Sequence, residues 1–349
     1  MPIVPNNWSV TIKDVAERAG VSESTVSRVL SGTETAIPFS EETRERVAQA
    51  ARELGYRPHP GARALRGKAT NLLGVIVREI DDPFFAQLIE AISNEAGAQG
   101  YDLVLGYAKS DPEEALALSE ILDLRFCDGL LLLGDLRESP EEQHALLQLG
   151  HNYRLVAVCR GDQPFPVWPS VGVNNRQGVC LGLDYLSSLG HRRIAYVDTG
   201  RVGDLRDRLQ AYREYMASLH GSECAAYVET CENSYEGGYG AMCRLLASPV
   251  PPTAVMTADD TMAIGALAAA ADAGVRVPRD LSLVGFDDIR IAAYMRPGLT
   301  TIRQPLERIA AEAVSLAIQV AHEAGIEPPV HRLVEPELVV RASCGPPAH

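Results

Sequence analysis

The sequence predicts an α/β protein with a small all-α region at its start and a larger body built on parallel sheets. Up to Leu54, the apolar residues recur at helical spacing. From Leu72 to Phe286, short apolar runs alternate with helical segments. Strands that are apolar on both faces and alternate with helices are typical of parallel sheets covered by helices on both sides. The 349 residues also exceed the length of one ordinary domain, so we expect two or three domains.

Two short helices joined by a tight turn are predicted at the start of the chain. Thr11 can cap the first helix, with Asp14 completing a capping box, and Gly20 can end it in the left-handed conformation. Ser22 caps the second helix. The apolar positions of the two helices are Ile12, Val15, Ala16, Ala19, Val26, Val29 and Leu30. This is the helix-turn-helix pattern, whose second helix enters the major groove of DNA. A small helical hairpin with a solvated face is the alternative.

A third helix and a basic segment follow. The helix begins at Ser40 and runs to Leu54, with Gly55 after it. Its expected inner face consists of Val47, Ala48 and Ala51. The next segment, residues 56–68, contains prolines, four positive charges and no acid. It is too small to have a core of its own.

In the body, strands and helices are expected in alternation. Strands are expected at 72–77, 101–107, 129–133, 155–159, 193–197, 226–230, 254–256 and 281–286. Helices are expected at 84–100, 113–124, 141–149, 177–189, 206–219, 237–246 and 262–273. About ten strands are many for one such sheet. We therefore expect two sheets with a break in the Pro- and Gly-rich stretch 161–170, leaving a helix at 306–325 and a final segment at 333–340.

The charge is distributed unevenly along the chain. The net charge of −14 by itself argues against a nucleic-acid partner. Residues 1–70, however, hold 10 Lys and Arg against 8 Asp and Glu, whereas the remainder holds 22 against 38. This polarity fits a DNA-reading region on an acidic body, although a balance of +2 is a weak electrostatic footprint.

Composition also excludes several classes of protein. The seven cysteines are scattered without a Cys-x-x-Cys pair, which fits a reducing cytosol better than a disulfide framework or a zinc site. Residues 1–9 lack the apolar core of a signal peptide, and no apolar run is long enough to span a bilayer. We expect a cytoplasmic protein without a metal or other cofactor.

Several motifs carry a resemblance to a known family. Thr-Ile-Lys-Asp-Val-Ala, Gly-Val-Ser-x-x-Thr-Val-Ser-Arg-Val-Leu, Leu-Gly-Tyr-Arg-Pro and Ala-Arg-x-Leu closely resemble the lactose/galactose-repressor (LacI/GalR) family of bacterial transcription regulators. Asp-Pro-Phe-Phe at 82–85 and Val-Gly-Phe-Asp-Asp at 284–288 extend the resemblance into the body. One departure is the loop 31–40, which is about three residues longer than the family's usual connection.

The resemblance implies a repressor that binds a pseudo-palindromic operator as a homodimer and responds to a small, sugar-like effector in a cleft between two lobes. It implies a helix-turn-helix domain (1–58), a hinge (59–70) and a doubly wound, periplasmic-binding-protein-like core of type I (71–343). The core divides into an N-lobe of about 71–168 plus 302–328 and a C-lobe of about 169–301 plus 329–343. The C-terminal residues lack a heptad repeat, so a dimer is expected rather than a tetramer held by a terminal bundle.

The candidate DNA-binding residues lie mainly on the second helix and in the hinge. Arg28 can make a bidentate contact to guanine, Glu23 can accept a hydrogen bond from cytosine, and Ser24 can serve either base. By resemblance, these three are specificity positions; alternatively, Glu23 is an acid that complements the helix dipole. Phosphate contacts suit Thr11, Thr25 and Ser27, and the remaining head candidates are Ser22 and Tyr56.

In the hinge, an apolar residue stands between two arginines. Leu65 matches the family's leucine, which wedges between base steps from the minor groove, and Arg63 and Arg66 would flank that groove. Alternatively, Leu65 packs against its own lobe. A segment that folds only on binding can be switched, because its ordering costs free energy.

The candidate effector-binding residues follow predicted strands, where ligands of open α/β sheets bind. By resemblance, Arg208 and Asp287 are the leading candidates for holding pairs of hydroxyls. The others are Phe84, Phe85, Cys159, Asn233 and Asp259. Cys159 stands where the family often has an acid, and Asn233 where it often has an aromatic ring. Asp287 and Asp288 can alternatively form a simple turn after a strand, and a structural role is expected for His191.

Two other classes of protein fit the sequence less well. A transporter's solute-binding protein would have a similar body, but the helical region and the lack of a signal peptide argue against it. An enzyme is not indicated, because the sequence shows no Gly-rich phosphate loop, metal-ligand cluster or nucleophile motif.

Overall fold

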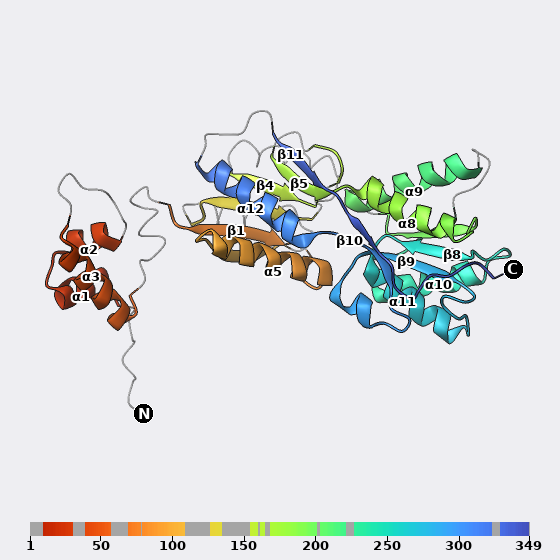
Figure 1. The fold of residues 1–349 in the computed structure, drawn as a ribbon, viewed down its shortest axis with the longest axis horizontal. Helices are drawn as coiled ribbons and strands as arrows, with labels where there is room; N and C mark the ends of the chain where they lie inside the picture. The colour runs from red at the N-terminus through yellow and green to blue at the C-terminus, as the bar shows by residue number, and fades with distance from the viewer. Residues whose placement is uncertain are drawn as a thin grey trace, which may run out of the picture. The chain divides into compact units, whose positions relative to one another are not determined.

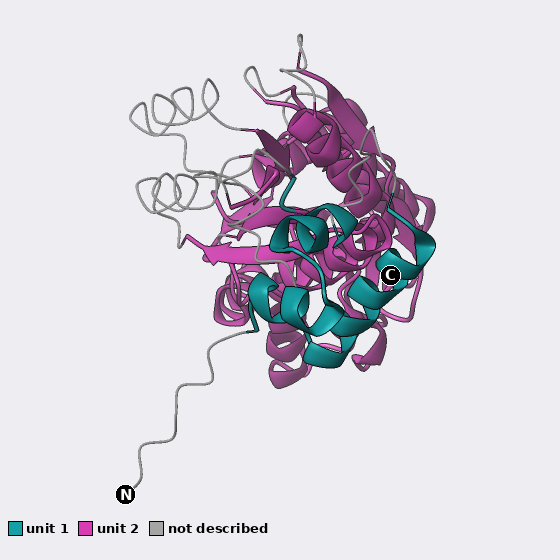
Figure 2. Ribbon diagram, turned by 90° about the vertical axis from the view of Figure 1, so that its left-hand side faces the viewer, with its two compact units in different colours: residues 1–70 teal, residues 71–349 magenta. Residues whose placement is uncertain are grey.

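The computed structural model describes residues 10–30, 39–56, 69–77, 79–108, 126–134, 154–159, 161–164, 168–200, 203–220, 227–322 and 329–348. They belong to two compact units (Figure 2), residues 1–70 and residues 71–349, called the head and the body below. The expected helices at 113–124 and 141–149, most of the loop 31–40, and Arg63, Leu65 and Arg66 lie outside the described residues.

The head contains three helices, α1 (Ile12–Ala19), α2 (Glu23–Leu30) and α3 (Glu41–Leu54). Thr11 and Asp14 form the predicted capping box, in which the Asp14 carboxylate accepts from the Thr11 amide at 2.7 Å. Gly20 has a φ of 65°, which a residue without Cβ adopts at low cost, and it ends α1. These predicted features of the turn are confirmed.

Small apolar residues from all three helices form the core of the head. It contains Val15, Ala16, Ala19, Val26, Val47, Ala50 and Ala51. The prediction for α3 was wrong at one position, because Ala50 is 3% exposed whereas Ala48 is only half-buried. The two positions lie about 200° apart around the helix, and the packing of α1 and α2 covers the side that carries Ala50.

Two six-stranded sheets form in the described part of the body (Figure 1). The first has the order β11-β5-β4-β3-β1-β2. Its strands are β1 (Leu72–Val77), β2 (Asp102–Tyr107), β3 (Gly129–Leu133), β4 (Leu155–Val158), β5 (Ser170–Val173) and β11 (His331–Val334), all paired in parallel. Helices α5 (Pro83–Ala98) and α12 (Leu306–His322) pack on each other, and α12 crosses β3, β4 and β5.

The second sheet has the order β12-β10-β9-β8-β6-β7, in which only β12 pairs antiparallel. Its strands are β6 (Ile194–Asp198), β7 (Val228–Thr230), β8 (Ala254–Thr257), β9 (Ser282–Asp287), β10 (Thr300–Arg303) and β12 (Glu337–Val339). Helices α8 (Asn175–Ser188) and α9 (Asp204–His220) pair on one face of this sheet (Figure 1). Helices α10 (Tyr235–Leu246) and α11 (Asp260–Asp272) pair on the other, and a 3-10 helix, η1 (Arg290–Tyr294), follows β9.

The strands divide between the sheets differently from the expected lobe boundaries. Strand β5, beyond the expected break at residue 168, still pairs with β4 in the first sheet. Residues 302–303 belong to β10 in the second sheet, and β11 lies in the first sheet. The expected strand at 333–340 is therefore two strands, β11 and β12. Pro336 stands between them and lacks the amide hydrogen that pairing requires.

As a result, the chain passes between the sheets three times, after β5, between β10 and α12, and between β11 and β12. Strands β5 and β10 did not appear among the expected strands, because Ser170–Val173 and Thr300–Arg303 contain too few consecutive apolar residues to form an apolar run. No helix among the described residues is long and apolar enough to cross a membrane.

Candidate functional sites

The second helix of the head presents a polar face to solvent. Glu23, Ser24 and Arg28 are exposed, whereas Val26 on the opposite side is fully buried. Thr25 and Ser27 are half-buried at the border of the two faces. The predicted base-reading side chains can therefore reach an outside partner without disturbing the core.

Hydroxyl groups hold the start of this helix. The Ser22 side chain accepts a hydrogen bond from the Thr25 amide at 3.2 Å, which is the predicted cap. Its Oγ also lies 2.8 Å from the Ser24 Oγ and 2.9 Å from the Thr25 Oγ1. Three hydroxyls thus converge on the exposed N-terminus of α2, where the positive end of the helix dipole favours an anion such as phosphate.

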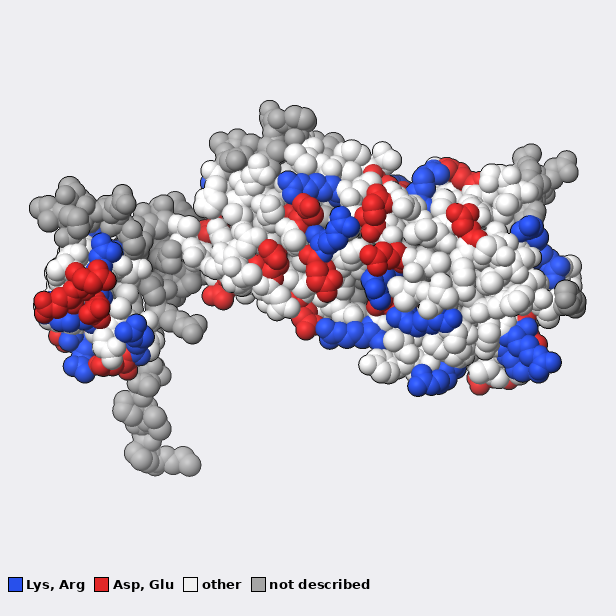
Figure 3. All heavy atoms as spheres, viewed as in Figure 1, with Lys and Arg blue, Asp and Glu red and all other residues white. Residues whose placement is uncertain are grey.

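The other helices of the head set the position of α2. Arg18 of α1 bonds Glu53 of α3 at 2.5 Å, and Tyr56 packs half-buried against the core. Thr11 is exposed at the start of α1. Figure 3 shows acidic and basic side chains side by side on the head rather than one basic face, in keeping with the small charge balance of this region.

In the body, five neighbouring strands of the second sheet each end in a polar residue. In sheet order these residues are Gln304 after β10, Asp287 at the end of β9, Asp259 after β8, Asp198 at the end of β6, and Asn233 after β7. Because the five strands are parallel, all five residues lie at the same edge of the sheet. We call them the strand-end row. Ligands of open α/β sheets bind at such an edge.

Arg208 of α9 lies over the middle of the strand-end row. Its side chain is only 4% exposed. The guanidinium donates to the Asn175 Oδ1 at 2.7 Å and to the Ala258 carbonyl at 2.6 Å, and it lies 3.4 Å from the Asp287 Oδ1. It also stacks 3.6 Å from the centre of the Phe286 ring. These contacts fix the planar group in one orientation.

A second layer of hydrogen bonds attaches Arg208 to the loop after β4. The Asp204 Oδ1 accepts from the Asn175 Nδ2 and from the Gly161 amide, both at 2.7 Å. The Asp162 Oδ1 accepts from the Asn175 amide at 2.8 Å. Because Gly161 and Asp162 follow a strand of the first sheet, the network links both sheets of the body.

Asp287 combines a strained backbone with a buried charge. Its φ is 112° and that of Asp288 is 57°, both in the region that residues with a Cβ rarely adopt. The Asp288 carboxylate accepts from Arg303 at 2.7 Å and from Arg341 at 2.5 Å, which holds this turn in place. The turn interpretation and the binding interpretation of Asp287 and Asp288 are thus compatible. Strain of this kind persists where the surroundings over-determine it, often at functional sites.

Acidic groups outnumber basic groups around Arg208. Burial raises the pKa of Asp287 well above its usual value, and the nearby carboxyls of Asp259, Asp260 and Asp82 raise it further, although Arg208 opposes the shift. Burial likewise raises the pKa of Asp204. The geometric ion pair of Arg208 with Asp287 therefore does not lower the pKa of that acid, because burial outweighs the single cation.

The comparisons with known proteins bear on both sites. Residues 11–59 match the model of the bacterial regulatory proteins, lacI family, and residues 183–344 match the periplasmic binding protein-like domain. The HTH-type transcriptional repressor PurR of Escherichia coli O139:H28 is 35% identical over 340 residues, which are 95% of this chain and 96% of that protein. The chain belongs to the LacI family. The corresponding PurR of Erwinia tasmaniensis is 36% identical over 88% of this chain and 89% of its own length.

Solved structures of LacI-family proteins agree with this assignment. The Lac repressor dimer bound to operator and the anti-inducer ONPF has a TM-score of 0.83 at 29% identity, covering 96% of this chain and 98% of that one. The complex of the transcriptional regulator CelR with cellobiose has a TM-score of 0.68 at 30% identity, covering 96% and 99%. The predicted fold class is confirmed, and so is the prediction of a DNA-binding transcriptional regulator with an effector-binding body.

Most of the residues predicted for the effector site of this LacI-family protein come together. Arg208, Asp259, Asp287 and Asn233 belong to the strand-end row or lie over it. Cys159 is buried after β4 with a φ of 59°. It is followed, after residue 160, by the loop that bonds Asp204.

The two predicted aromatic residues differ from each other. Phe84 is 5% exposed and packs in the core, so the structure does not place it as a ring that faces a ligand. Phe85 is half-buried, and its ring lies beside Gly134 after β3. The rings meet edge to face at 5.2 Å. His191 is 1% exposed and bonds Thr253 and the Gly345 carbonyl, which is the expected structural role.

Sequence reasoning missed four polar residues of this LacI-family site. Asn175, Asp198, Asp204 and Gln304 are all buried there. Asp198 directly follows the expected apolar strand at 193–197, so a search for polar residues after the expected strands would have found it. Gln304 follows β10, which the apolar runs did not predict.

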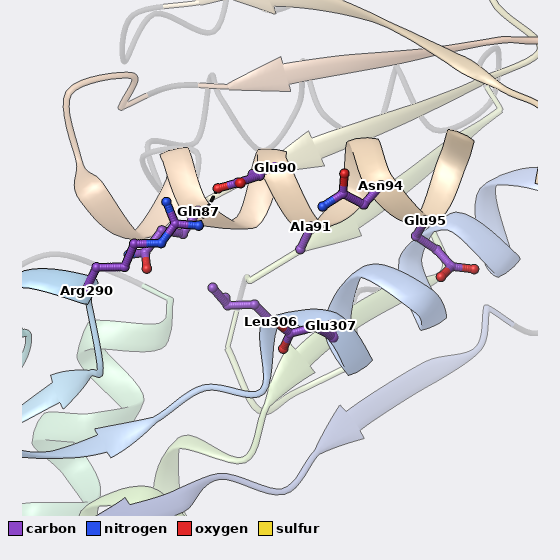
Figure 4. Close-up of a pocket in the computed structure, with 8 residues that line it drawn as sticks. All are labelled: Gln87, Glu90, Ala91, Asn94, Glu95, Arg290, Leu306 and Glu307. Atoms are coloured by element: carbon purple, nitrogen blue, oxygen red, sulfur yellow. Dashed lines mark hydrogen bonds and ion pairs between the residues drawn. The ribbon is translucent and has the colours of Figure 1, made fainter. Parts of the chain in front are cut away.

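A separate hollow of about 260 Å³ lies between α5 and α12 (Figure 4). Arg290 of η1 reaches the Glu90 carboxylate of α5 there at 2.5 Å, which connects the two sheet systems. Both side chains are more than half exposed, so the pair contributes little to stability. This hollow is not lined by any residue of the strand-end row.

Proposed function

We propose that this protein represses transcription by binding a pseudo-palindromic operator as a homodimer, and that a small, sugar-like ligand between the two lobes controls the binding. Repressor function agrees with the names of the PurR relatives, and the Lac repressor structure is of a dimer on operator DNA. A two-fold dimer requires a site with matching symmetry. Such a protein acts in the cytoplasm, where the chromosome lies, and needs no catalytic turnover.

The observation that carries the DNA-binding part is the exposed polar face of α2 over its buried apolar face. Arg28 donates two hydrogen bonds to guanine, and Glu23 accepts from the amino group of cytosine. Ser24 completes the base-reading set. The phosphate contacts come from Thr11, Ser22, Thr25, Ser27 and Tyr56.

The hinge supplies the minor-groove contacts in this proposal. Leu65 inserts between base steps together with the same residue of the second subunit, and Arg63 and Arg66 lie along the groove. An apolar side chain in a basic segment without a core supports this assignment, as does the match to the family motif.

The effector part rests on the strand-end row and Arg208. Carboxylates and a guanidinium bond pairs of hydroxyls, and an aromatic ring covers the apolar face of a sugar. Arg208 and Asp287 take the central role, with Asp259 and Asn233 beside them and Phe85 as the ring. Cys159 lies beside this set. The CelR complex with cellobiose supports a sugar-like ligand for a relative of this chain.

Control of DNA binding follows from the three passages of the chain between the sheets. A ligand that binds one arrangement of the lobes better than another shifts the population toward it, by no more than its difference in affinity. Because Arg208 and Asn175 join the second sheet to the loop after β4, ligand binding at this point is suited to change the angle between the lobes.

The test is a band-shift titration of the dimer on a panel of palindromic and scrambled duplexes. Arg28→Ala should lower specific affinity by about 5- to 150-fold, corresponding to the ~1–3 kcal/mol of a bidentate base contact. Leu65→Ala should reduce the affinity and the bending of the DNA. Arg52→Ala on α3 is the matched control, because this exposed arginine donates to Gln49 of its own helix and lies outside the proposed DNA-binding set. Unchanged sequence-specific binding in both test variants would refute the assignment.

A further inference from the structure

Three oxygen atoms of the strand-end row are buried without a hydrogen-bond partner. They are the Oδ1 of Asp198, the Oδ1 of Asn233 and the Oε1 of Gln304. Asp198 is 1% exposed and Gln304 is 3% exposed. Leaving a buried acceptor unpaired costs folding free energy, and a charged acceptor costs more than a neutral one. Three such atoms at one edge of one sheet indicate that a partner is missing from the free protein.

Asp198 is the most informative of the three. Its Oδ2 accepts from the Gly200 amide at 2.8 Å, so one oxygen has a structural role and the other has none. The hydroxyl of Tyr196, on the same strand and the same face, is also buried and unpaired. Burial raises the pKa of Asp198, although hydrogen bonds from the Gly200 and Thr199 amides and the charge of Arg213 oppose the shift.

A second buried acid near the same sheet, Asp260, has a hydrogen-bond partner for each of its oxygens. Both oxygens of Asp260 are paired, one with the Thr301 hydroxyl at 2.6 Å and the other with the Ile289 amide at 2.9 Å. Asp260 is 0% exposed, so its burial is comparable with that of Asp198. The fold can therefore satisfy a buried carboxylate completely, and it does not do so at Asp198.

The charges of the site restrict the missing partner. Asp198, Asp204, Asp259 and Asp287 are buried carboxyls, whereas Arg208 is the buried cation among the described residues of the site. Arg208 already bonds Asn175, Ala258 and Asp287. An anionic ligand would meet four carboxyls and one guanidinium whose hydrogen bonds are already made, so the site offers it few free donors.

We propose that the effector carries no negative charge and is recognised through hydrogen-bond donors, with an amino or ammonium group bonded to the free oxygen of Asp198. This inference rests on the proposed effector site and names the class of its ligand. Asn233 and Gln304 accept from further amino or hydroxyl groups, so that an amino sugar or a similar amino-bearing polyol fits the row. Sugar phosphates and sugar acids are excluded, because their anionic groups would find few free donors.

The first experiment needs neither a known ligand nor DNA. Asp198→Asn keeps an oxygen for the Gly200 amide and removes a buried charge, so the melting temperature should stay unchanged or rise by roughly 2–4 °C. Asp260→Ala is the control and should lower it, because the Thr301 hydroxyl and the Ile289 amide would lose their acceptor. A clear loss of stability in Asp198→Asn would show that Asp198 is structural and would overturn the proposal.

The second experiment measures ligand binding by thermal shift and calorimetry on the full-length protein. The probes are matched series: glucosamine, glucose, glucuronate and glucose 6-phosphate, and cytidine, uridine and uridine monophosphate. An amino member should bind best in at least one series, and Asp198→Asn should weaken it at least tenfold while changing the hydroxyl analogue less. Stronger binding of an acidic or phosphorylated member, or binding by none, would overturn the proposal. Operator binding without ligand tests the proposed function separately.

Discussion

The polar side chains of the candidate sites are exposed in the head of this LacI-family protein and buried in its body. In the head, Glu23, Ser24 and Arg28 stand exposed on a helix whose other face packs on a small core. In the body, Arg208 and Asp287 are buried and bonded to each other; Arg208 also donates to the Ala258 carbonyl, and Asp287 accepts from the Gln304 side chain. The difference arises from how the chain packs around each set.

The difference reflects what each region has to recognise. DNA is a large partner that binds at a surface. The side chains that contact its bases must therefore extend from that surface, and they need few contacts within the protein. A small ligand must be enclosed, and the groups that enclose it must be held in place before it arrives. Consequently, substitutions on the exposed face of the head should change binding more than stability, whereas substitutions of the mutually bonded groups in the effector site should change both.

Removing the buried cation should have the largest effect. Arg208→Met leaves the carboxyls of Asp204 and Asp287 without their guanidinium and should destabilise the body by about 3–5 kcal/mol. Urea unfolding followed by tryptophan fluorescence measures the loss.

The matching change in the head is Arg18→Met, which breaks the half-exposed pair with Glu53. It should cost no more than about 1 kcal/mol. Equal losses for the two variants would contradict the contrast between the regions.

Crowding a glycine beside the effector site should have the next largest effect. A Cβ on Gly285 would lie 2.0 Å from the Asp260 Oδ1, so Gly285→Ala should destabilise the body by about 1–3 kcal/mol through overpacking. Gly240→Ala on α10 is the control, because its Cβ would meet only the end of Arg244 at 3.5 Å. The control should instead stabilise the protein by about 0.5–1 kcal/mol, since alanine is the better helix former.

Two helix caps test whether binding and stability separate within the head. Ser22→Ala and Ser40→Ala each remove a side-chain cap and should each lower the local stability by about 1 kcal/mol. Hydrogen exchange of peptides from α2 and α3 measures this loss. Only Ser22→Ala should also weaken operator binding, because Ser40 caps the helix that lies away from the proposed base-reading face. A similar loss of binding in both variants would show that the cap of α2 has no separate part in contacting DNA.

The stability of the two regions should depend on pH with opposite signs. This effect should be smaller than those of the substitutions above. The pKa of Asp260 is raised well above 3.8 by burial, so the folded body holds a proton that the unfolded chain releases. The stability this proton contributes is complete below the unfolded value and is lost as the pH rises through the folded pKa. Hydrogen bonds from Thr11 lower the pKa of Asp14, so its contribution is present above 3.8 and is lost as the pH falls.

Hydrogen exchange followed from about pH 2 to about pH 8, corrected for intrinsic rates, separates the two signs, and Asp260→Asn should flatten the slope of the body. If the body instead gained stability through Asp260 as the pH rises, the raised pKa assigned to Asp260 would be wrong.

The sequence by itself determined the local features of the molecule. Thr11, Gly20 and Ser22 define the turn between the first two helices, because caps and left-handed glycines act over a few neighbouring residues. The longer apolar runs likewise predicted most strands of the body, and the family motifs pointed to Arg208 and Asp287. These predictions depend on chemistry within a few residues or on a motif that keeps its order along the chain.

Only the tertiary structure decided how distant segments combine. Residues 170–173 join the first sheet, and 331–334 and 337–339 separate into different sheets, because pairing partners far along the chain compete for each short strand. The same holds for the choice of Ala50 over Ala48 and for the burial of Phe84. Whether a polar atom is paired also depends on groups brought from elsewhere. Asp198 and Asp260 both stand at the junction of a strand and its following segment, and only the arrangement of the folded chain supplies partners to one and withholds them from the other.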